Sequence, residues 1–332
     1  MNEAAFLTAL RALPLHPGAR GLADDAAVLG TQVLTHDMLV EGVHFLPTDP
    51  AGDVAWKLVA VNLSDLAAKG AVPTGVLMGY GLAGDDAWDR AFLAGLAETL
   101  TAFACPLLGG DTVVLPKGAP RMLSLTAIGE ASVAPARSGA RMGDALWVTG
   151  TIGDAGAGLA IAQGADGPGE LLARYRRPVP RLAEGLALAP LVSAMMDVSD
   201  GLLIDASRMA AASGCGVAIE LGDVPLSDAL RSMPSPTFVS SAVEKSPHSA
   251  QSGFSTSLET NGRGEGLSEL GTVLAAVTAG DDYELLFALA PGLQPPVPAT
   301  RIGMFAAGPG LTLTHRGEPV PLPKRLGFEH SA

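Results

Sequence analysis

The sequence predicts an α/β protein built as two domains. Its 332 residues are too many for one ordinary core and suit two. Hydrophobic residues make up 48% of the chain and charged residues 17%, so we expect a globular protein with a large buried core. In both halves, short apolar runs typical of strands alternate with longer periodic segments typical of helices, which is the pattern of an α/β fold.

The first domain is placed at residues 1–136 and opens on a short amphipathic helix over 3–13, which Pro14 and Pro17 end. A Gly/Asp/Ala segment at 20–31 is expected to be a loop. Later elements follow from apolar residues spaced three or four apart in helices and two apart in strands. They are a strand from 32 that runs into His36-Asp37, a helix at 53–69, a strand at 74–82, a helix at 86–104 and a strand at 121–129.

The second domain is placed at residues 137–332. The same spacing predicts a strand at 144–149 followed by a small-residue helix, a helix at 181–190, a strand at 195–198, a helix at 201–212, and strands at 216–221 and 284–289. Residues 233–266 are rich in Ser, Gly, Pro and Thr and have few apolar anchors. We expect this stretch to be a long flexible surface loop.

The charge and cysteine content narrow the function. A formal net charge of −13 argues against nucleic-acid binding, which needs a basic face, but it allows a phosphate-bearing small ligand held through divalent cations. The two cysteines, Cys105 and Cys215, form neither a metal spacing nor a disulfide framework. With no basic signal-like start and no run of about 18 apolar residues, we expect a cytoplasmic protein without a membrane span.

Aspartates recur beside glycines at the ends of the predicted strands. A single such Asp is more often a turn residue, but six sites in one chain weaken that interpretation, because strand ends of α/β folds bind ligands and Asp is a preferred ligand of Mg²⁺. There is no G-x-x-x-x-G-K-[ST] run and no H-R-D or D-F-G signature, so P-loop and protein-kinase folds are excluded. The sites are Asp24-Asp25, Asp37, Asp65, Asp111, Asp197 with Asp200, and Asp281-Asp282.

Seven segments in fixed order give a more specific indication. They are ADDAAVL (23–29), THDMLVEGVHF (35–45), VNLSDLAAKGAVP (61–73), GGDT (109–112), RSGARMGDALWVTGTIGDAGAGL (137–159), DVSDGLLIDASRMAAASGCGVAIEL (197–221) and GDDYELLF (280–287). On these segments the chain resembles the thiamine-monophosphate kinase family of the aminoimidazole ribonucleotide synthetase-like superfamily. The resemblance implies a homodimer formed through the N-terminal domain, ATP in a cleft between the two domains, and ATP-dependent, Mg²⁺-assisted phosphorylation of thiamine monophosphate to thiamine diphosphate.

Carried over by position, the resemblance also implies roles for individual residues. No catalytic base is expected, because the acceptor phosphate is already an anion and in-line transfer needs alignment and charge neutralisation. The implied ligands of several Mg²⁺ ions are Asp25, Thr35, His36, Asp37, Asp65, Asp111, Asp197 and Asp200. The implied ATP contacts are Gly110, Asp111, Arg137 and Ser199, and the implied contacts to the thiamine phosphate are His44, Asp281 and Phe328.

The chain departs from the family pattern at four positions. Ala23 stands for the usual Gly, His36 for Thr, Lys69 for Met and Asp281 for Glu. A ligand at position 36 that uses the backbone carbonyl would survive the change, whereas a side-chain ligand would be altered. These departures bear on rate and affinity more than on the class of reaction.

Other functions stay open at this point. A selenophosphate synthetase should carry a reactive Cys near its N-terminus, but no Cys precedes Cys105, and a hydrogenase-maturation relative should end in Cys rather than Ser331-Ala332. Aminoimidazole ribonucleotide synthetase fits the LVEGVHF and DYELLF runs less well. A catalytically inactive metal-binding or scaffolding protein is a further alternative, which Mg²⁺-dependent ATP consumption with thiamine monophosphate would distinguish.

Overall fold

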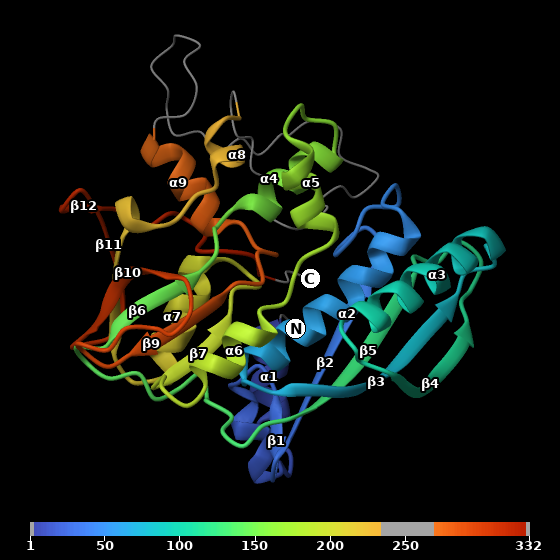
Figure 1. Ribbon diagram of the computed structural model, residues 1–332, viewed down its shortest axis with the longest axis horizontal. Helices are drawn as coiled ribbons and strands as arrows, with labels where there is room; N and C mark the ends of the chain where they lie inside the picture. The colour runs from blue at the N-terminus through green and yellow to red at the C-terminus, as the bar shows by residue number, and fades with distance from the viewer. Residues whose placement is uncertain (1–2, 234–268, 330–332) are drawn as a thin grey trace.

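A computed structural model describes residues 3–233 and 269–329 of the chain. It contains two sheets with a long helix, α2 (Ala51–Ala68), between them (Figure 1). Of the segment 233–266, Met233 is described and is buried against a small apolar cluster, and the rest lies outside the described residues. None of the described helices is long and apolar enough to cross a bilayer.

The N-terminal sheet has the strand order β1-β2-β5-β3-β4. Neighbouring strands are antiparallel except β3 and β4, which are parallel. One face packs against α2 and α3, because alternate residues of β5 and the residues Val33 and Leu39 of β2 are apolar and buried there. The bounds are β1 Ala27–Leu29, β2 Gln32–Val40, β3 Val72–Leu82, α3 Asp86–Ala102, β4 Leu107–Val114 and β5 Met122–Glu130.

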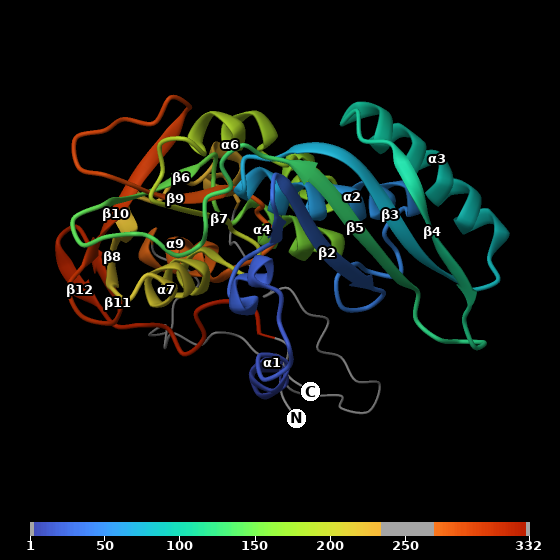
Figure 2. The ribbon, with the colours of Figure 1, turned by 90° about the horizontal axis from the view of Figure 1, so that it is seen from below.

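The opposite face of this sheet carries no helix of the described chain (Figure 2). Strand alternation places a second set of apolar side chains there, and they are 40–55% exposed: Met38, Leu77, Leu108 and Met122. A sheet with an exposed apolar face is typical of a surface that a partner covers.

The C-terminal sheet has the order β12-β11-β8-β10-β6-β9-β7 and is antiparallel apart from the pair β8–β11. The helices α7 and α9 cover one face over the largest apolar core, and α6 covers part of the other. The bounds are β6 Ala145–Thr149, α4 Asp154–Ala162, α5 Gly169–Arg176, α6 Leu182–Leu188, β7 Ala194–Asp197, α7 Leu202–Ala212, β8 Gly216–Glu220, α8 Asp228–Arg231, α9 Glu269–Thr278, β9 Leu285–Leu289, β10 Ala299–Ala306, β11 Gly310–His315 and β12 Glu318–Val320.

The helix α2 belongs to both halves of the molecule. Its first three turns pack on the N-terminal sheet, whereas Ala67 and Ala68 at its end join Leu188 and Phe287 in a core of the C-terminal half. The contact is close: a Cβ added to Gly185 of α6 would lie 2.0 Å from the carbonyl oxygen of Ala67. Residues at the C-terminal end of α2 are therefore held against both sheets.

The predicted α/β class with two layered halves is confirmed, and the predicted elements agree with the observed ones within a few residues. The expected loop at 20–31 is wrong in part, because it contains a 3-10 turn (Pro17–Leu22) and β1 (Ala27–Leu29), which pairs with β2 across Gly30. A three-residue strand is too short to show a period. The helix α1 (Glu3–Leu10) also ends before the predicted 13, one turn ahead of Pro14.

Candidate active site

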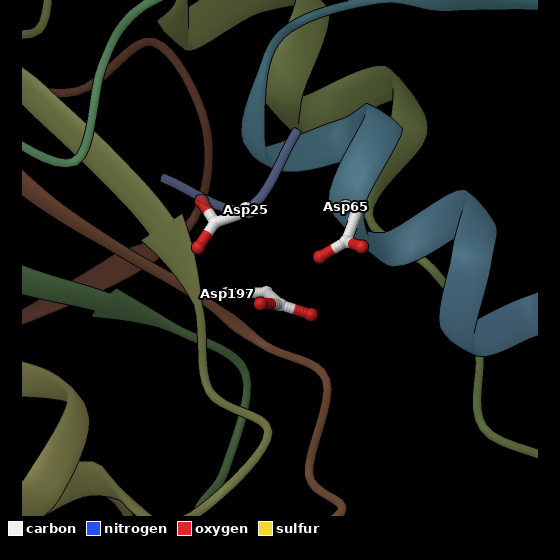
Figure 3. A group of neighbouring side chains, drawn as sticks. All are labelled: Asp25, Asp65 and Asp197. Carbon is white, nitrogen blue, oxygen red and sulfur yellow. The ribbon is translucent and has the colours of Figure 1, made fainter. Parts of the chain in front are cut away.

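Three aspartates meet where the two halves of the molecule approach each other. Asp25 precedes β1, Asp65 lies in the last turn of α2, and Asp197 is the last residue of β7. Each offers a carboxylate oxygen, and these atoms lie within 4.8 Å of one another. Figure 3 shows the three side chains grouped together, each carried by a different segment of the chain. The fold thus assembles three of the predicted metal ligands from segments distant in sequence.

The electrostatics of this cluster favour a bound cation. Burial raises the pKa of Asp65 well above its usual value, and the charges of Asp37, Asp197 and Asp25 raise it further, against a hydrogen bond from Thr35. Burial likewise raises the pKa of Asp197, as does the charge of Asp25, although Ser64 Oγ donates to Asp197 Oδ2 at 2.5 Å. Repulsion between buried carboxylates is what a divalent cation relieves.

Asp25 differs from its two neighbours because cations surround it. Burial alone would raise its pKa, but the charges of Lys69 and Arg137 outweigh burial and lower it. Arg137 donates from Nε at 3.2 Å and from Nη2 to Asp25 Oδ1, while Lys69 Nζ lies 2.7 Å from Asp25 Oδ2. That Oδ2 atom is buried and receives no hydrogen bond of acceptable geometry. A buried group of three carboxylates whose oxygens lie within 4.8 Å of one another fits a metal ion.

Of the three residues of β2 that are predicted to bind metal, Thr35, His36 and Asp37, not all direct their side chains toward the cluster. Thr35 Oγ1 donates to Asp65 Oδ2, and the backbone N–H of Asp37 donates to Asn62 Oδ1 at 3.1 Å. His36 lies between them, so its side chain points to the opposite face, where Nδ1 lies 2.8 Å from Thr126 Oγ1. A contribution from position 36 to the cluster is therefore restricted to its backbone.

The segment after β7 is held by a buried carboxylate. Asp205 is fully buried in the first turn of α7 and accepts hydrogen bonds at 3.1 Å from the backbone N–H groups of Ser199 and Asp200. Arg208 bridges the carboxylates of Asp200 and Asp205. Burial, followed by the charge of Asp200, raises the pKa of Asp205 to about 7. Asp205 thus fixes the backbone of two predicted ligand positions.

The predicted substrate residue Asp281 lies beside the same segment. Its backbone N–H donates to the carbonyl of Ser199 at 2.8 Å, and its carboxylate accepts from Lys57 Nζ at 2.8 Å and from the Tyr283 hydroxyl at 3.1 Å. Asp281 and Tyr283 have φ values of 69° and 52°, a left-handed conformation that non-glycine residues adopt rarely. Such strain is typical of functional segments.

Lys57 also links this region to His44, since its Nζ donates to the His44 carbonyl at 3.0 Å. The ammonium lies 4.3 Å from the centroid of the Tyr175 ring, a cation–π contact. These side chains line a shallow pocket between α2 and α5, together with Phe45. Two of the predicted substrate contacts, His44 and Asp281, are therefore brought to one lysine.

The remaining predicted residues lie at different distances from the cluster. The backbone N–H of Phe328 donates to the Asp200 carbonyl at 2.8 Å, so the C-terminal segment reaches this site. Gly110 and Asp111 are on β4, the exposed edge strand on the far side of the N-terminal sheet (Figure 1). The Asp111 carboxylate accepts from the N–H of Thr112 at 2.9 Å, and it is not part of the metal-competent group found among the described residues.

Two residues that organise the site, Lys57 and Asp205, were not expected from the sequence. Both are charged residues inside helix faces that the apolar period assigns to the core: Lys57 stands beside Leu58, and Asp205 lies between Ile204 and Ala206. A charge at a core position was the available signal, because buried charges require partners.

The metal-free protein should lose stability as pH rises through neutrality. Burial, followed by the charges of Asp200 and Asp25, raises the pKa of Asp37 from 3.8 to about 6. A carboxyl group whose pKa is raised on folding stabilises the protein fully at pH values below its unfolded-state pKa. This stabilisation is lost as the pH rises through its folded-state pKa. From Asp37 alone, the free energy of unfolding should fall by about 1–2 kcal/mol between pH 5 and pH 7.5 in EDTA, and by less with excess Mg²⁺. The raised pKa of Asp205 adds to this loss of stability. The lowered pKa of Asp25 has the opposite effect, but only at pH values below the usual range of a carboxyl pKa. Urea denaturation across this window measures the slope; a flat profile in EDTA would contradict the prediction.

Comparison with known proteins identifies the class. Residues 23–131 match the family model for the AIR synthase related protein N-terminal domain, and residues 141–316 match the model for the corresponding C-terminal domain. The two-sheet fold with its carboxylate cluster is thus that of an AIR synthase related protein.

The relatives narrow the class further. The thiamine-monophosphate kinase of Caulobacter vibrioides is 37% identical over 95% of this chain and 86% of its own length, and that of Escherichia coli is 36% identical over 94% and 92%. The solved structure of AaThiL complexed with AMPPCP and TMP superposes with a TM-score of 0.78 at 26% identity, covering 99% of this chain and 97% of that one. The chain belongs to the thiamine-monophosphate kinase family.

Proposed function

We propose that this protein transfers the γ-phosphate of ATP to thiamine monophosphate and so makes thiamine diphosphate. The observation that carries the proposal is the convergence of Asp25, Asp65 and Asp197 in a chain whose curated relatives are thiamine-monophosphate kinases. The AaThiL structure, with a nucleotide analogue and TMP bound in one protein of the same fold, supports the pairing of the two substrates.

Mg²⁺ is the metal we propose for the cluster. The donor set is all carboxylate and hydroxyl oxygen, which suits a hard divalent cation. Asp25, Asp65 and Asp197 would hold the first ion, and the neighbouring carboxylates of Asp37 and Asp200 would hold others. Bound Mg²⁺ would neutralise phosphate charge and let two anions approach each other.

The chain's own residues would position the reactants. Arg137 can present a planar guanidinium to phosphate oxygens once Asp25 is engaged by metal. Ser199, held by Asp205, lies beside Asp281, so the nucleotide segment and the acceptor segment are joined by a backbone hydrogen bond. Lys57 fixes the Asp281 carboxylate at the acceptor side. Since the acceptor phosphate is anionic, no residue needs to remove a proton.

A product assay tests the function directly. Purified protein with ATP, Mg²⁺ and thiamine monophosphate should yield thiamine diphosphate and ADP in equal amounts, and EDTA should abolish the product. Thiamine, hydroxymethylpyrimidine phosphate and aminoimidazole precursors are the competing acceptors to compare. No thiamine diphosphate above a no-enzyme control, over a range of Mg²⁺ and monovalent salts, would overturn the proposal.

We also propose a homodimer formed through the open face of the N-terminal sheet. Met38, Leu77, Leu108 and Met122 give this face an apolar surface that the described chain leaves uncovered. The predicted ATP contacts Gly110 and Asp111 lie on its edge strand, β4, so a partner packed here would lie next to them.

The variant Leu77→Glu should therefore weaken the dimer by at least about tenfold, because it places a charge in a desolvated apolar interface. Light scattering at micromolar concentration gives the mass. Leu186→Glu is the control, since Leu186 is 52% exposed on α6 of the other half and should leave the mass unchanged. A monomeric wild-type protein would rule out the dimer.

The domain limits, 1–136 and 137–332, and a cytoplasmic location also stay proposals. The first is supported by the two sheets, whose strands lie on either side of residue 136 in sequence. The second is supported by two buried free cysteines, Cys105 and Cys215, as in proteins of reducing compartments.

A further inference from the structure

Lys69 is a fully buried charged side chain at the site. It follows the last residue of α2 and has no exposed side-chain surface. Its Nζ lies 2.5 Å from Asp24 Oδ1 and 2.7 Å from Asp25 Oδ2, and it donates to the Met195 carbonyl at 3.1 Å. A buried ammonium is costly unless it is paired, so these two carboxylates are its compensation.

The distribution of cations over the acidic cluster is uneven. Asp24 is paired with Arg20 and Lys69, and Asp25 with Arg137 and Lys69. Asp65 and Asp197 accept hydrogen bonds from the hydroxyls of Thr35 and Ser64, and within the described residues neither has a basic side chain within 4.0 Å. Among Asp25, Asp65 and Asp197, the cationic charge is therefore concentrated on Asp25.

Lys69 contacts Asp25 differently from Arg137. Arg137 is 21% exposed and reaches Asp25 Oδ1, so it can turn toward solvent or a ligand. Lys69 is enclosed and lies 2.7 Å from Oδ2, the other oxygen of the same carboxylate. Position 69 is also one of the four at which the chain departs from the family pattern.

We propose that the Lys69 ammonium is a resident cation of the metal site, which takes over at Asp25 part of the charge compensation that a divalent ion would otherwise supply. Lys69 is thus a positioning residue that sets how tightly, and in what number, divalent ions bind the cluster. The inference deepens the proposed function, since it concerns the metal set of that site. It is tested without ATP or thiamine monophosphate, so its failure is separable from failure of the kinase assignment.

The test is a Mn²⁺ titration of the nucleotide-free wild type and of Lys69→Met, in which electron paramagnetic resonance measures the free and bound Mn²⁺. Met has a similar length and no charge. Removing a positive charge about 3 Å from a ligand oxygen should tighten the first Mn²⁺ by at least about tenfold, or add one bound ion per chain. Lys57→Met is the matched control. It removes a buried ammonium of α2 that pairs with Asp281 and not with Asp25, so Mn²⁺ binding should be unchanged.

A second measurement covers loss of stability. Lys69→Met leaves Asp24 and Asp25 short of one cation, so its melting temperature should drop in EDTA and recover with millimolar Mg²⁺, whereas any drop in Lys57→Met should not recover. If Lys69→Met is insoluble without metal, the charge-balanced Asp24→Asn/Lys69→Met variant replaces it and should still bind Mn²⁺ more tightly than wild type. If Lys69→Met binds the same number of Mn²⁺ ions with the same affinity as wild type, and Mg²⁺ does not restore its melting temperature, then Lys69 forms only a structural ion pair. That result would overturn the proposal.

Discussion

Asp65→Asn and Asp197→Asn should each lower turnover roughly a thousandfold at saturating Mg²⁺, because each removes a charge that holds the metal in the transition state. Both side chains contribute to the group whose oxygens lie within 4.8 Å of one another. Asn keeps the shape and one acceptor oxygen, so the hydrogen bonds from Thr35 and Ser64 are preserved. Product formation with ATP and thiamine monophosphate measures the loss.

Neither substitution should destabilise the metal-free protein. The pKa of each carboxyl is raised by burial and by its neighbours' charges, so removing one charge relieves repulsion, and the melting temperature in EDTA should stay equal or rise. Helix capping does not explain these residues, since Asp65 is inside α2 and the N-cap of α7 is Gly201. Asp85 is a true N-cap, accepting from the Trp88 N–H, and Asp85→Asn should keep full activity. Near-wild-type turnover in Asp65→Asn or Asp197→Asn would remove that residue from the metal site.

Arg181→Met should lower the free energy of unfolding by about 3 kcal/mol, because it leaves a buried carboxylate without its cation. Glu284 is 2% exposed and accepts from Arg181 Nε and from Thr149 Oγ1, each at 2.7 Å. A Cβ on Gly150 would lie 2.1 Å from Glu284 Oε1, so the carboxylate has no room to move away. Urea denaturation at pH 7.5 gives the difference.

The comparison for this prediction is Arg177→Met. Arg177 makes ion pairs with Asp53 and Glu98 whose carboxylates are 24% and 54% exposed, and such pairs contribute less than about 1 kcal/mol. Adding Glu284→Gln to Arg181→Met should restore part of the loss, since the unpaired charge is then gone. A loss of similar size in Arg177→Met, or no restoration in the double variant, would show that buried charge is not the cause.

The apolar periods predicted α2, α3 and β5, and all three lie within two residues of their expected bounds, whereas α9 and β10 were not predicted. The sheet orders were not predictable, since antiparallel pairing of β2 with β5 joins segments that no local pattern connects. The edge strand β4 was not recognised, because all eight of its residues are exposed and show no alternation.

The site was predictable in its residue types and less so in its geometry. The recurring aspartates indicated a metal site, and Asp25, Asp65 and Asp197 do lie together. Strand alternation would have placed the His36 side chain on the far face of β2, away from Asp37, had the period been applied to that run. The pairing of Lys69 with Asp24 and Asp25 depends on the path of the chain after α2, which no spacing in the sequence encodes.

The position of α2 has a consequence for folding. This helix supplies core residues to the N-terminal sheet through Leu58 and Leu63, and to the C-terminal half through Ala67 and Ala68. Neither half can lose its core without exposing apolar surface of the other, so the two sheets should melt as one cooperative unit despite their separate strands. Asp65, a proposed metal ligand on the last turn of this helix, should then keep its position only while both sheets are folded.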